Sequence, residues 1–293
     1  MHSVTALSRV GLGTNNFGRR LDLEGARAVV DAAIDAGVTH IDTADIYGGG
    51  ESERFLGEIL TGRRDRVVLA TKFGMGQGGN GSPEYVRQAI DASLARLRTD
   101  HVDLFYYHRP DGVTPIWETV GAMHELVEAG KVRQLGISNV DAAQLRDAAA
   151  AAPVGFVQNR YSLLERGVEA ELLPLCSELG VGFVPYFPLA SGLLTGKYRR
   201  GESATSGRLA GREIPAERWD AVEALERFAK ERGRTLLEVA IGGLAAQPAV
   251  GSVIAGATSP EQVRANAAAG DWEPSAEDLA ALDEVVPRAQ FER

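Results

Sequence analysis

The feature that most constrains the fold is an alternation of short β-branched segments with amphipathic segments along the whole chain. Residues 24–36 carry apolar side chains at helical spacing, and a short apolar segment begins directly afterwards at Val38. The same succession repeats, and strands are expected to start at or near Arg9, Val38, Val67, Val102, Arg133, Gly155, Val181 and Val250. About eight such units favour a closed (β/α)8 barrel, the TIM-barrel fold, over an open doubly wound α/β sheet.

The chain length agrees with one such barrel. A sequence of 293 residues is ordinary for a single α/β barrel, and no linker, charge block or low-complexity segment interrupts it. We therefore expect one domain over residues 1–293. The segment Leu189–Pro215 breaks the alternation and exceeds the ~12–15 residues of ordinary structureless connections, so it is a functional candidate.

Composition excludes several classes of partner. The formal net charge of −9 argues against nucleic acid, and the single cysteine, Cys176, cannot form an intrachain disulfide. No apolar segment approaches the ~18 residues of a membrane span, and the N-terminus lacks the features of a signal peptide. We expect a soluble cytoplasmic protein without nucleic-acid or membrane partners. The oligomeric state stays open.

Four side chains that could take part in proton transfer lie at or just after the ends of three predicted strands. Asp42 and Tyr47 follow the Val38 strand, Lys72 ends the Val67 strand, and His108 ends the Val102 strand. Carboxyl ends of barrel strands meet at one mouth, so these side chains should converge there. A buried lysine favours phenolate, which should lower the pKa of Tyr47 below its ordinary ~10 and make it a general acid.

Each of these residues also has a purely structural interpretation. Two other motifs give weaker evidence of function. An Asp–Lys pair is often only an ion pair, and His108 alone fits a core histidine. Gly74–Gly79 fits the dinucleotide pattern Gly-x-Gly-x-x-Gly but does not follow the first strand, and Gly192–Tyr198 is one residue short of a phosphate-binding Walker loop. The five histidines are scattered, so no metal site is expected.

An ordered series of segments resembles the aldo-keto reductase family nearly end to end. The branch with the Gly-Leu-Leu-Thr-Gly-Lys-Tyr loop is the most similar one, and it includes bacterial aldo-keto reductases and potassium-channel β-subunits. The segments that carry the resemblance are Gly11–Thr14, His40–Gly48, Thr71–Lys72, Asp103–Asp111, Gly136–Asn139, Gln158–Ser162, Pro188–Tyr198 and Gly256–Asn266.

The resemblance implies a (β/α)8 barrel that binds a nicotinamide cofactor across its mouth, with Asp42, Tyr47, Lys72 and His108 as the catalytic tetrad. Ser138, Asn139 and Gln158 match residues that hold the carboxamide, and Tyr186 matches the aromatic residue that stacks on the nicotinamide. The remaining implied cofactor contacts are Gly13, Thr14, Asp42, Pro188, Leu189, Ser191, Leu193, Lys197, Arg208, Gly256, Thr258, Gln262 and Asn266.

The sequence departs from the family pattern at the adenosine end. Members that clamp a 2′-phosphate use charged side chains where this chain has Gly256-Ala257 and Gln262. NADPH is the expected cofactor, with Arg264 or Arg208 as the source of charge, and NADH is the alternative. The chain also ends soon after its last predicted helix, so we expect no long C-terminal loop over the substrate pocket.

The resulting hypothesis is an NAD(P)H-dependent reductase of small aldehydes or ketones. Tyr47, activated by Lys72 and Asp42, would protonate the carbonyl oxygen while His108 polarises it. Side chains expected to face the pocket are Phe17, Phe73, Met75, Arg109 and Phe187. The alternatives are an NAD-dependent aldose or alcohol dehydrogenase and a non-catalytic nicotinamide-sensing subunit; the complete tetrad and the absence of an N-terminal extension argue against the latter.

Overall fold

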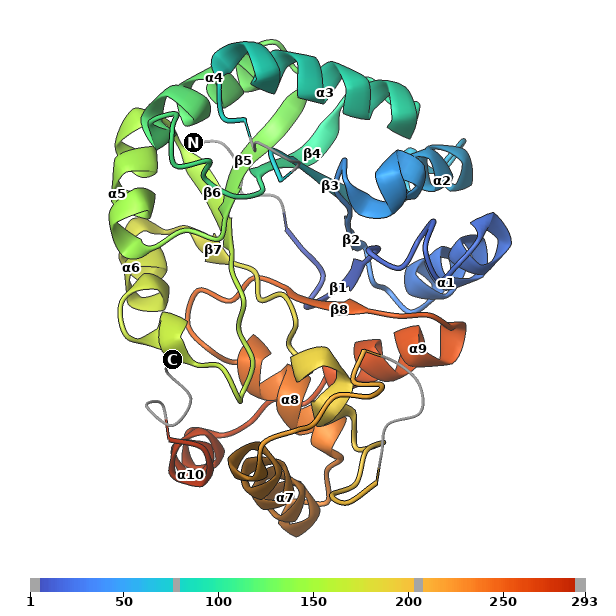
Figure 1. Ribbon diagram of the computed structural model, residues 1–293, viewed down its shortest axis with the longest axis vertical. Coiled ribbons are helices and arrows are strands. Elements are labelled where there is room, and N and C mark those ends of the chain that lie inside the picture. Colours follow the sequence, from blue (N-terminus) through green and yellow to red (C-terminus); the bar gives the residue numbers. More distant parts are fainter. Residues whose placement is uncertain (1–5, 76–79, 203–207, 288–293) are drawn as a thin grey trace.

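Eight parallel strands form one curved sheet at the centre of the molecule (Figure 1). The computed structural model describes residues 6–75, 80–202 and 208–287. Neighbours in the sheet follow the order β7-β6-β5-β4-β3-β2-β1-β8. The strands are β1 (Val10–Gly13), β2 (His40–Asp42), β3 (Val68–Phe73), β4 (Val102–Tyr107), β5 (Val132–Ser138), β6 (Val154–Gln158), β7 (Gly182–Phe183) and β8 (Val253–Gly256).

Backbone contacts between the two outer strands close this sheet into a barrel. Parallel bridges join Phe183 to Val250 and Tyr186 to Ile254. The amide of Ile254 also donates to the carbonyl oxygen of Pro185 at 3.0 Å. The strand β7 is short, but its extension towards Tyr186 continues along β8. The predicted (β/α)8 barrel is therefore confirmed.

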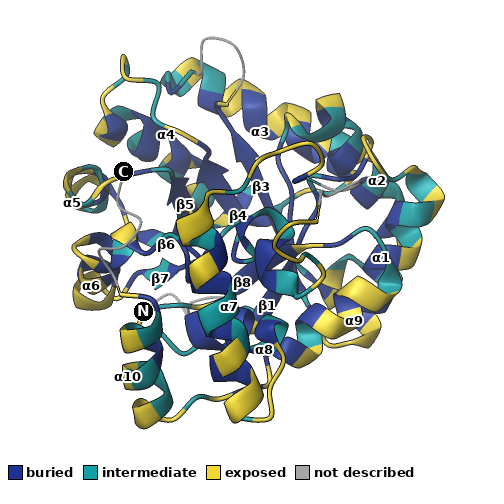
Figure 2. Ribbon diagram, turned by 60° about the horizontal axis from the view of Figure 1, so that its bottom comes forward, coloured by how far each residue is buried: buried dark blue, intermediate teal, exposed yellow. Residues whose placement is uncertain are grey.

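Helices surround the barrel and bury one face each against it (Figure 2). Predicted starts are confirmed where the side chain of Ser82 accepts from Tyr85 and where Asp141 forms a capping box with Gln144. The helices are α1 (Leu23–Asp35), α2 (Glu51–Ile59), α3 (Pro83–Leu97), α4 (Ile116–Glu128), α5 (Ala142–Ala151), α6 (Leu172–Leu179), α7 (Ala216–Glu231), α8 (Leu236–Ala245), α9 (Pro260–Ala269) and α10 (Ala276–Val285).

The helix α8 is absent from the sequence prediction. Its segment is apolar almost throughout and contains Gly242 and Gly243, so it lacks the polar face on which helical periodicity depends. A capping box between Thr235 and Glu238 marks its start. The predicted long loop at 189–215 contains the short 3-10 segment η4 (Ala190–Thr195). Residues 203–207 of that loop and 76–79 of the Gly74–Gly79 motif lie outside the described residues.

The barrel interior and the layer outside it have different contents. Inside, an apolar cluster contains Ala70, Leu104, Tyr106, Phe156, Val184 and Ile254. A larger apolar cluster joins the strands to the helices. Polar side chains gather towards the carboxyl ends of the strands, where Asp42 and Lys72 are buried. In the described part of the chain, no helix has the length and apolar character needed to cross a membrane.

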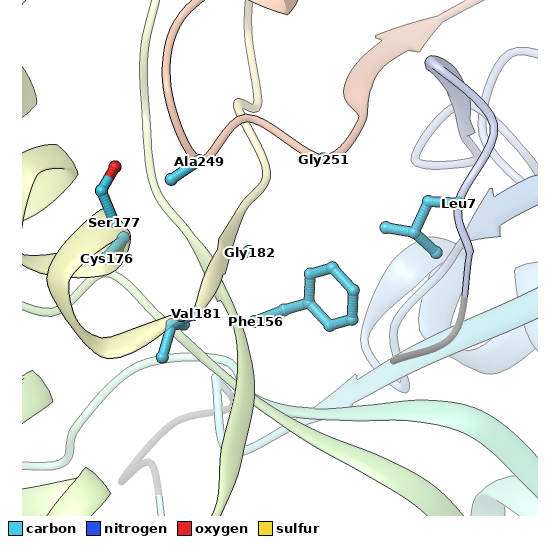
Figure 3. A pocket seen from close by; sticks show the side chains of 9 residues that line it. Leu7, Phe156, Cys176, Ser177, Val181, Gly182, Ala249 and Gly251 are labelled. Carbon is cyan, nitrogen blue, oxygen red and sulfur yellow. The ribbon is translucent and has the colours of Figure 1, made fainter. Parts of the chain in front are cut away.

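A depression of about 420 Å³ lies at the opposite end of the barrel, near the starts of β7 and β8 (Figure 3). Leu7, Phe156 and Val181 contribute apolar surface to it, and the side chains of Cys176 and Ser177 lie beside it. None of the predicted site residues lines this depression. The candidate site is therefore at the other end.

Candidate active site

The four predicted catalytic residues converge at the carboxyl ends of neighbouring strands. Asp42 is the last residue of β2, Lys72 lies near the end of β3, and His108 directly follows β4. Tyr47 begins the 3-10 turn η1 (Tyr47–Gly50) after β2. Because these strands are adjacent and parallel, their ends open into one mouth.

Lys72 and Asp42 form a buried ion pair at the centre of the site. The ammonium group of Lys72 donates to Oδ1 of Asp42 and, at 2.8 Å, to the carbonyl oxygen of Thr43. Gln158 Nε2 donates to the other oxygen of Asp42 at 2.9 Å. Burial lowers the pKa of Lys72, but the Asp42 carboxylate and the Tyr47 hydroxyl together more than offset this, so the net direction is upward. Lys72 therefore carries its charge at neutral pH.

Tyr47 lies directly beside this charge. The Nζ atom of Lys72 is 5.3 Å from the centroid of the Tyr47 ring. Burial raises the pKa of the Tyr47 hydroxyl by more than the lysine lowers it, so the pKa lies above the ordinary value of 10.0. The sequence-based expectation of a lowered pKa was wrong, because it counted the neighbouring charge and not the loss of water around the phenol.

His108 contacts Tyr47 edge-on and is electrically neutral. The two ring centroids are 6.0 Å apart, with an angle of 79° between the rings. Burial, followed by the positive charges of Lys72 and Arg109, lowers the pKa of His108 to about 3. At neutral pH the imidazole therefore offers one N–H donor and one acceptor nitrogen rather than a charge.

A cleft of about 570 Å³ opens over these residues. Tyr47, Asp42 and His108 line it, while Lys72 is fully buried beneath. The predicted cofactor contacts that also line the cleft are Gly13, Thr14, Asp42, Ser138, Asn139, Gln158, Tyr186, Pro188, Leu189, Ser191, Lys197, Arg208, Gly256, Thr258, Gln262 and Asn266. Leu193 does not line it, because its side chain packs in the core.

The five predicted pocket side chains divide into three groups. Arg109 is exposed and does not line the cleft, so that expectation was wrong for it. Met75 and Phe187 line the cleft. Phe17 and Phe73 are fully buried in the core, so that expectation was wrong for them. Phe73 stacks on Phe105 and Tyr107 at centroid distances of 4.7 and 5.3 Å. The sequence alone does not show whether an apolar residue near a strand end lies in the core or in the pocket, since both are lined by apolar side chains.

Hydrogen bonds fix the wall that holds Asn139. Its amide nitrogen donates to the carbonyl oxygen of His108 at 2.8 Å, and its amide oxygen accepts from the Tyr186 hydroxyl at 2.6 Å. The backbone of Asn139 has φ of 58°, a left-handed conformation that asparagine tolerates better than most residues. The Ser138 hydroxyl donates to the carbonyl oxygen of Gln158 at 2.6 Å. These polar groups are therefore held in fixed directions.

The far end of the cleft is a turn between β8 and α9. There the side-chain oxygen of Gln262 accepts from the backbone amide of Thr258 at 2.8 Å and from its hydroxyl at 3.2 Å. Ser259 caps α9. Gly256, Thr258, Gln262, Ala265 and Asn266 line this end, and none of them is charged.

Several cleft residues escaped sequence reasoning. Asn15, Asn16 and Arg20 lie in the loop after β1, and Leu237 lies in α8. The sequence could have indicated the residues of the loop after β1, because the neighbouring Gly13 and Thr14 were already expected to contact the cofactor. Leu237 had no signal, since its helix was not recognised. Among the described residues, no group of three or more histidine, cysteine, aspartate or glutamate side chains has metal-binding geometry.

The fold and this site agree with comparisons to known proteins. The chain belongs to the aldo/keto reductase family, whose model matches residues 9–287. It is 38% identical to a probable voltage-gated potassium channel subunit beta of Oryza sativa subsp. japonica, over 88% of this chain and 85% of the relative. The predicted family is therefore confirmed, and family membership supports an oxidoreductase.

Two solved structures have the same architecture. The glycerol dehydrogenase AKR11B4 from Gluconobacter oxydans superposes with a TM-score of 0.89 at 28% identity, covering 100% of this chain and 95% of that one. An aldo/keto reductase from Klebsiella pneumoniae, solved in complex with NADP and acetate, has a TM-score of 0.78 at 33% identity. That match covers 96% of this chain and 92% of the neighbour.

Proposed function

We propose that this chain is an NAD(P)H-dependent oxidoreductase that reduces small aldehydes or ketones to alcohols, with Tyr47 as the general acid. The observation that carries the proposal is the buried Lys72–Asp42 pair beneath Tyr47, at the floor of a cleft of about 570 Å³. Pockets for organic cofactors and substrates usually measure about 300–1,000 Å³. The relative solved with NADP supports the choice of cofactor.

The polar groups of the cleft suit a nicotinamide nucleotide. Asn139 and Ser138 offer oriented amide and hydroxyl groups for a carboxamide, beside the Tyr186 ring. Lys197 offers a charge for phosphate. When bound, the cofactor supplies a hydride from C4 of its nicotinamide to the carbonyl carbon.

Proton delivery falls to the residues at the floor of the cleft. The raised pKa of Tyr47 keeps the phenol protonated at neutral pH, the state an acid requires. As the phenol gives up its proton, the nearby ammonium of Lys72 stabilises the phenolate, and Asp42 holds that ammonium in place. Neutral His108 donates a hydrogen bond to the carbonyl oxygen and so favours negative charge there.

NADPH is our proposed cofactor, because a structural neighbour named aldo/keto reductase is solved in complex with NADP, and NADH is the alternative. The uncharged turn around Thr258 and Gln262 favours NADH, because a 2′-phosphate is best held by a guanidinium or ammonium group. The same turn supports a second candidate function, an NAD-dependent aldose or alcohol dehydrogenase working in the oxidative direction. The structural neighbour named glycerol dehydrogenase is consistent with it.

A third candidate is a non-catalytic nicotinamide-sensing subunit. It draws support from the relative named as a potassium channel subunit beta. The complete set of Asp42, Tyr47, Lys72 and His108 favours catalysis over sensing. Cofactor binding without turnover in either direction would favour the sensor.

The test is oxidation of NADPH and NADH with a panel of aldehydes and ketones, comparing wild type with Tyr47→Phe. We expect the variant to lose at least roughly 100-fold in kcat, the usual contribution of a general acid, while still binding cofactor. Tyr85→Phe is the matched control, because it removes a hydroxyl that does not line the cleft. Near wild-type turnover by folded Tyr47→Phe would refute the assignment of the acid.

A further inference from the structure

Lys72 has a second aromatic neighbour besides Tyr47. The Nζ atom of Lys72 is 5.3 Å from the centroid of the Tyr47 ring and 5.8 Å from the centroid of the Tyr106 ring. Tyr47 lines the cleft, whereas Tyr106 belongs to the apolar cluster inside the barrel. A cation within about 6 Å of a ring face is attracted by the ring, and more strongly where water is excluded. The ammonium group therefore has one ring towards the cleft and another towards the barrel interior.

The register of the sheet places Tyr106 beside Lys72. Tyr106 on β4 is paired with Lys72 on β3 and with Gly136 on β5. A β-carbon on Gly136 would lie 2.9 Å from Cγ of the Tyr106 ring and would overlap its Cδ1 and Cε1 atoms. The ring therefore fills the space that Gly136 leaves open. The strand pairing and this space together fix where the ring lies.

Tyr106 offers Lys72 the face of its ring and no charge. The residue is completely buried, and in the described part of the chain its hydroxyl has no hydrogen-bond partner of normal geometry. Burial raises the pKa of this hydroxyl well above the ordinary value of 10.0, so the phenol stays neutral. A buried hydroxyl without a partner costs free energy. A role for Tyr106 in the site therefore falls to its ring.

The hydrogen bonds of Lys72 hold its ammonium group from one side only. The group donates to Oδ1 of Asp42 and to the carbonyl oxygen of Thr43, and both acceptors lie at the end of β2. Tyr106 is on β4, on the other side of β3. Its ring occupies space that water would otherwise enter, and a charge is screened less where water is absent. The Lys72 charge therefore acts more strongly on its neighbour Tyr47.

We infer that Tyr106 is a positioning residue for the proposed reduction, because its ring holds the Lys72 ammonium group beneath Tyr47 and keeps water away from it. Tyr106 does not line the cleft, so it acts through Lys72 and not on substrate or cofactor. The inference rests on the proposed function, in which Lys72 stabilises the phenolate that forms when Tyr47 gives up its proton. It adds a residue of the barrel interior to the requirements for proton transfer.

The kinetic test separates the ring of Tyr106 from its hydroxyl. Tyr106→Phe keeps the ring, so its kcat should stay close to the wild-type value. Tyr106→Met keeps much of the volume without the ring. We expect this variant to lose roughly tenfold in kcat, the size expected for a cation–π contact away from water, with the KM for cofactor unchanged.

Phe156→Met is the matched control for a lost interior ring. Phe156 belongs to the same apolar cluster as Tyr106 but lines the depression at the opposite end of the barrel, so its kcat should not change. A Phe156→Met variant as slow as Tyr106→Met would overturn the inference, since any loss of interior packing would then have the same effect. Equal kcat values for Tyr106→Phe and Tyr106→Met would also overturn it.

Nuclear magnetic resonance tests the contact without turnover, using lysine labelled with carbon-13 at its ε-carbon. Replacing the other lysines by arginine one at a time assigns the signal of Lys72; they are Lys131, Lys197 and Lys230. The Lys72 ε protons should resonate upfield in wild type and in Tyr106→Phe, because the rings shield them, and should move downfield in Tyr106→Met. The Lys197 signal, which lies beside the Tyr198 ring, should not move.

This measurement separates the inference from the proposed function. An unchanged Lys72 signal in Tyr106→Met, together with Tyr47-dependent reduction by wild type, would refute the role of Tyr106 and leave the reductase intact. The expected shift in a protein that reduces no carbonyl would support the contact and count against the reductase. Nuclear Overhauser contacts between the Lys72 ε protons and the Tyr106 ring test the same geometry in wild type, and their absence would overturn the inference even if Tyr106→Met does not fold.

Discussion

Lys72 is the single residue whose surroundings explain most of the site. Its side chain is completely buried, yet Asp42 and the carbonyl oxygen of Thr43 satisfy its ammonium group. Buried ion pairs contribute little net stability when intact, but removing one partner leaves a charge without compensation. The pair thus positions a positive charge beneath Tyr47. Substitution of either partner alone is expected to destabilise the fold.

We therefore expect Lys72→Met to lower the free energy of unfolding by about 3–5 kcal/mol, because Asp42 remains buried with its charge unpaired. The double variant Asp42→Asn/Lys72→Met should be more stable than Lys72→Met, since both charges are gone. Urea denaturation at neutral pH measures both. A double variant as unstable as the sum of the two single variants would contradict this coupling.

A histidine that is buried in its neutral form makes the stability of the fold depend on pH. Burial lowers the pKa of His40 from 6.5 to about 4, and its Nδ1 lies 2.9 Å from the hydroxyl of Ser252. Below pH 6.5 the unfolded chain takes up a proton on this residue that the folded chain refuses until about pH 4. Stability should therefore fall as the pH drops through this window, by at most about 1.4 kcal/mol per pH unit from this group.

Denaturation midpoints measured across this pH window test the prediction with His40→Asn beside wild type. The variant should show a shallower dependence on pH, whatever its absolute stability. The matched comparison is His124→Asn, which removes a histidine for which burial is incomplete. An equally steep pH dependence in His40→Asn and wild type would argue against a neutral buried His40.

At the scale of elements, the helices α2 and α3 touch where Gly57 faces the end of α3. A β-carbon on Gly57 would lie 2.7 Å from the carbonyl carbon of Leu97 and would overlap the carbonyl oxygen of Arg96. In α4, a β-carbon on Gly121 would meet no atom within 4 Å. The two glycines sit in similar helical positions but differ completely in their neighbours.

Gly57→Ala should therefore destabilise the protein by about 1–3 kcal/mol, because the two helices must move apart. Gly121→Ala should stabilise it by up to about 1 kcal/mol, since alanine is the better helix former and has room. Thermal or urea denaturation of the two variants is the measurement. Equal effects of both substitutions would mean that the helix contact does not constrain residue 57.

At the scale of the whole molecule, the barrel was predictable because most of its strands and helices show their own hydrophobic periodicity in the sequence. The order of the four reactive residues along the chain was sufficient to place them at one mouth. What failed depends on contacts between distant segments. The net pKa of Tyr47 depends on how much water the assembled barrel excludes. The burial of Phe17 and Phe73 depends on packing partners that cannot be identified from the local sequence.

The helix α8 was unpredictable for a related reason. An apolar segment with two glycines is typical of several environments, and only packing against the finished barrel selects the helix. Arg20 and Arg208 are far apart in sequence and line one cleft only because the loop after β1 and the segment after η4 both border it. Relationships of charge across the mouth therefore required the structure.

The most direct measurement for the central claim is the transfer of deuterium from cofactor labelled at C4 of the nicotinamide. Product alcohol is analysed by mass spectrometry after incubation with an aldehyde, using cofactor labelled on either face. We expect wild type to place deuterium from one face on the former carbonyl carbon, and Tyr47→Phe to form little labelled alcohol while still binding cofactor. Alcohol without deuterium from either label, or labelled alcohol formed at the wild-type rate by Tyr47→Phe, would contradict the proposed mechanism.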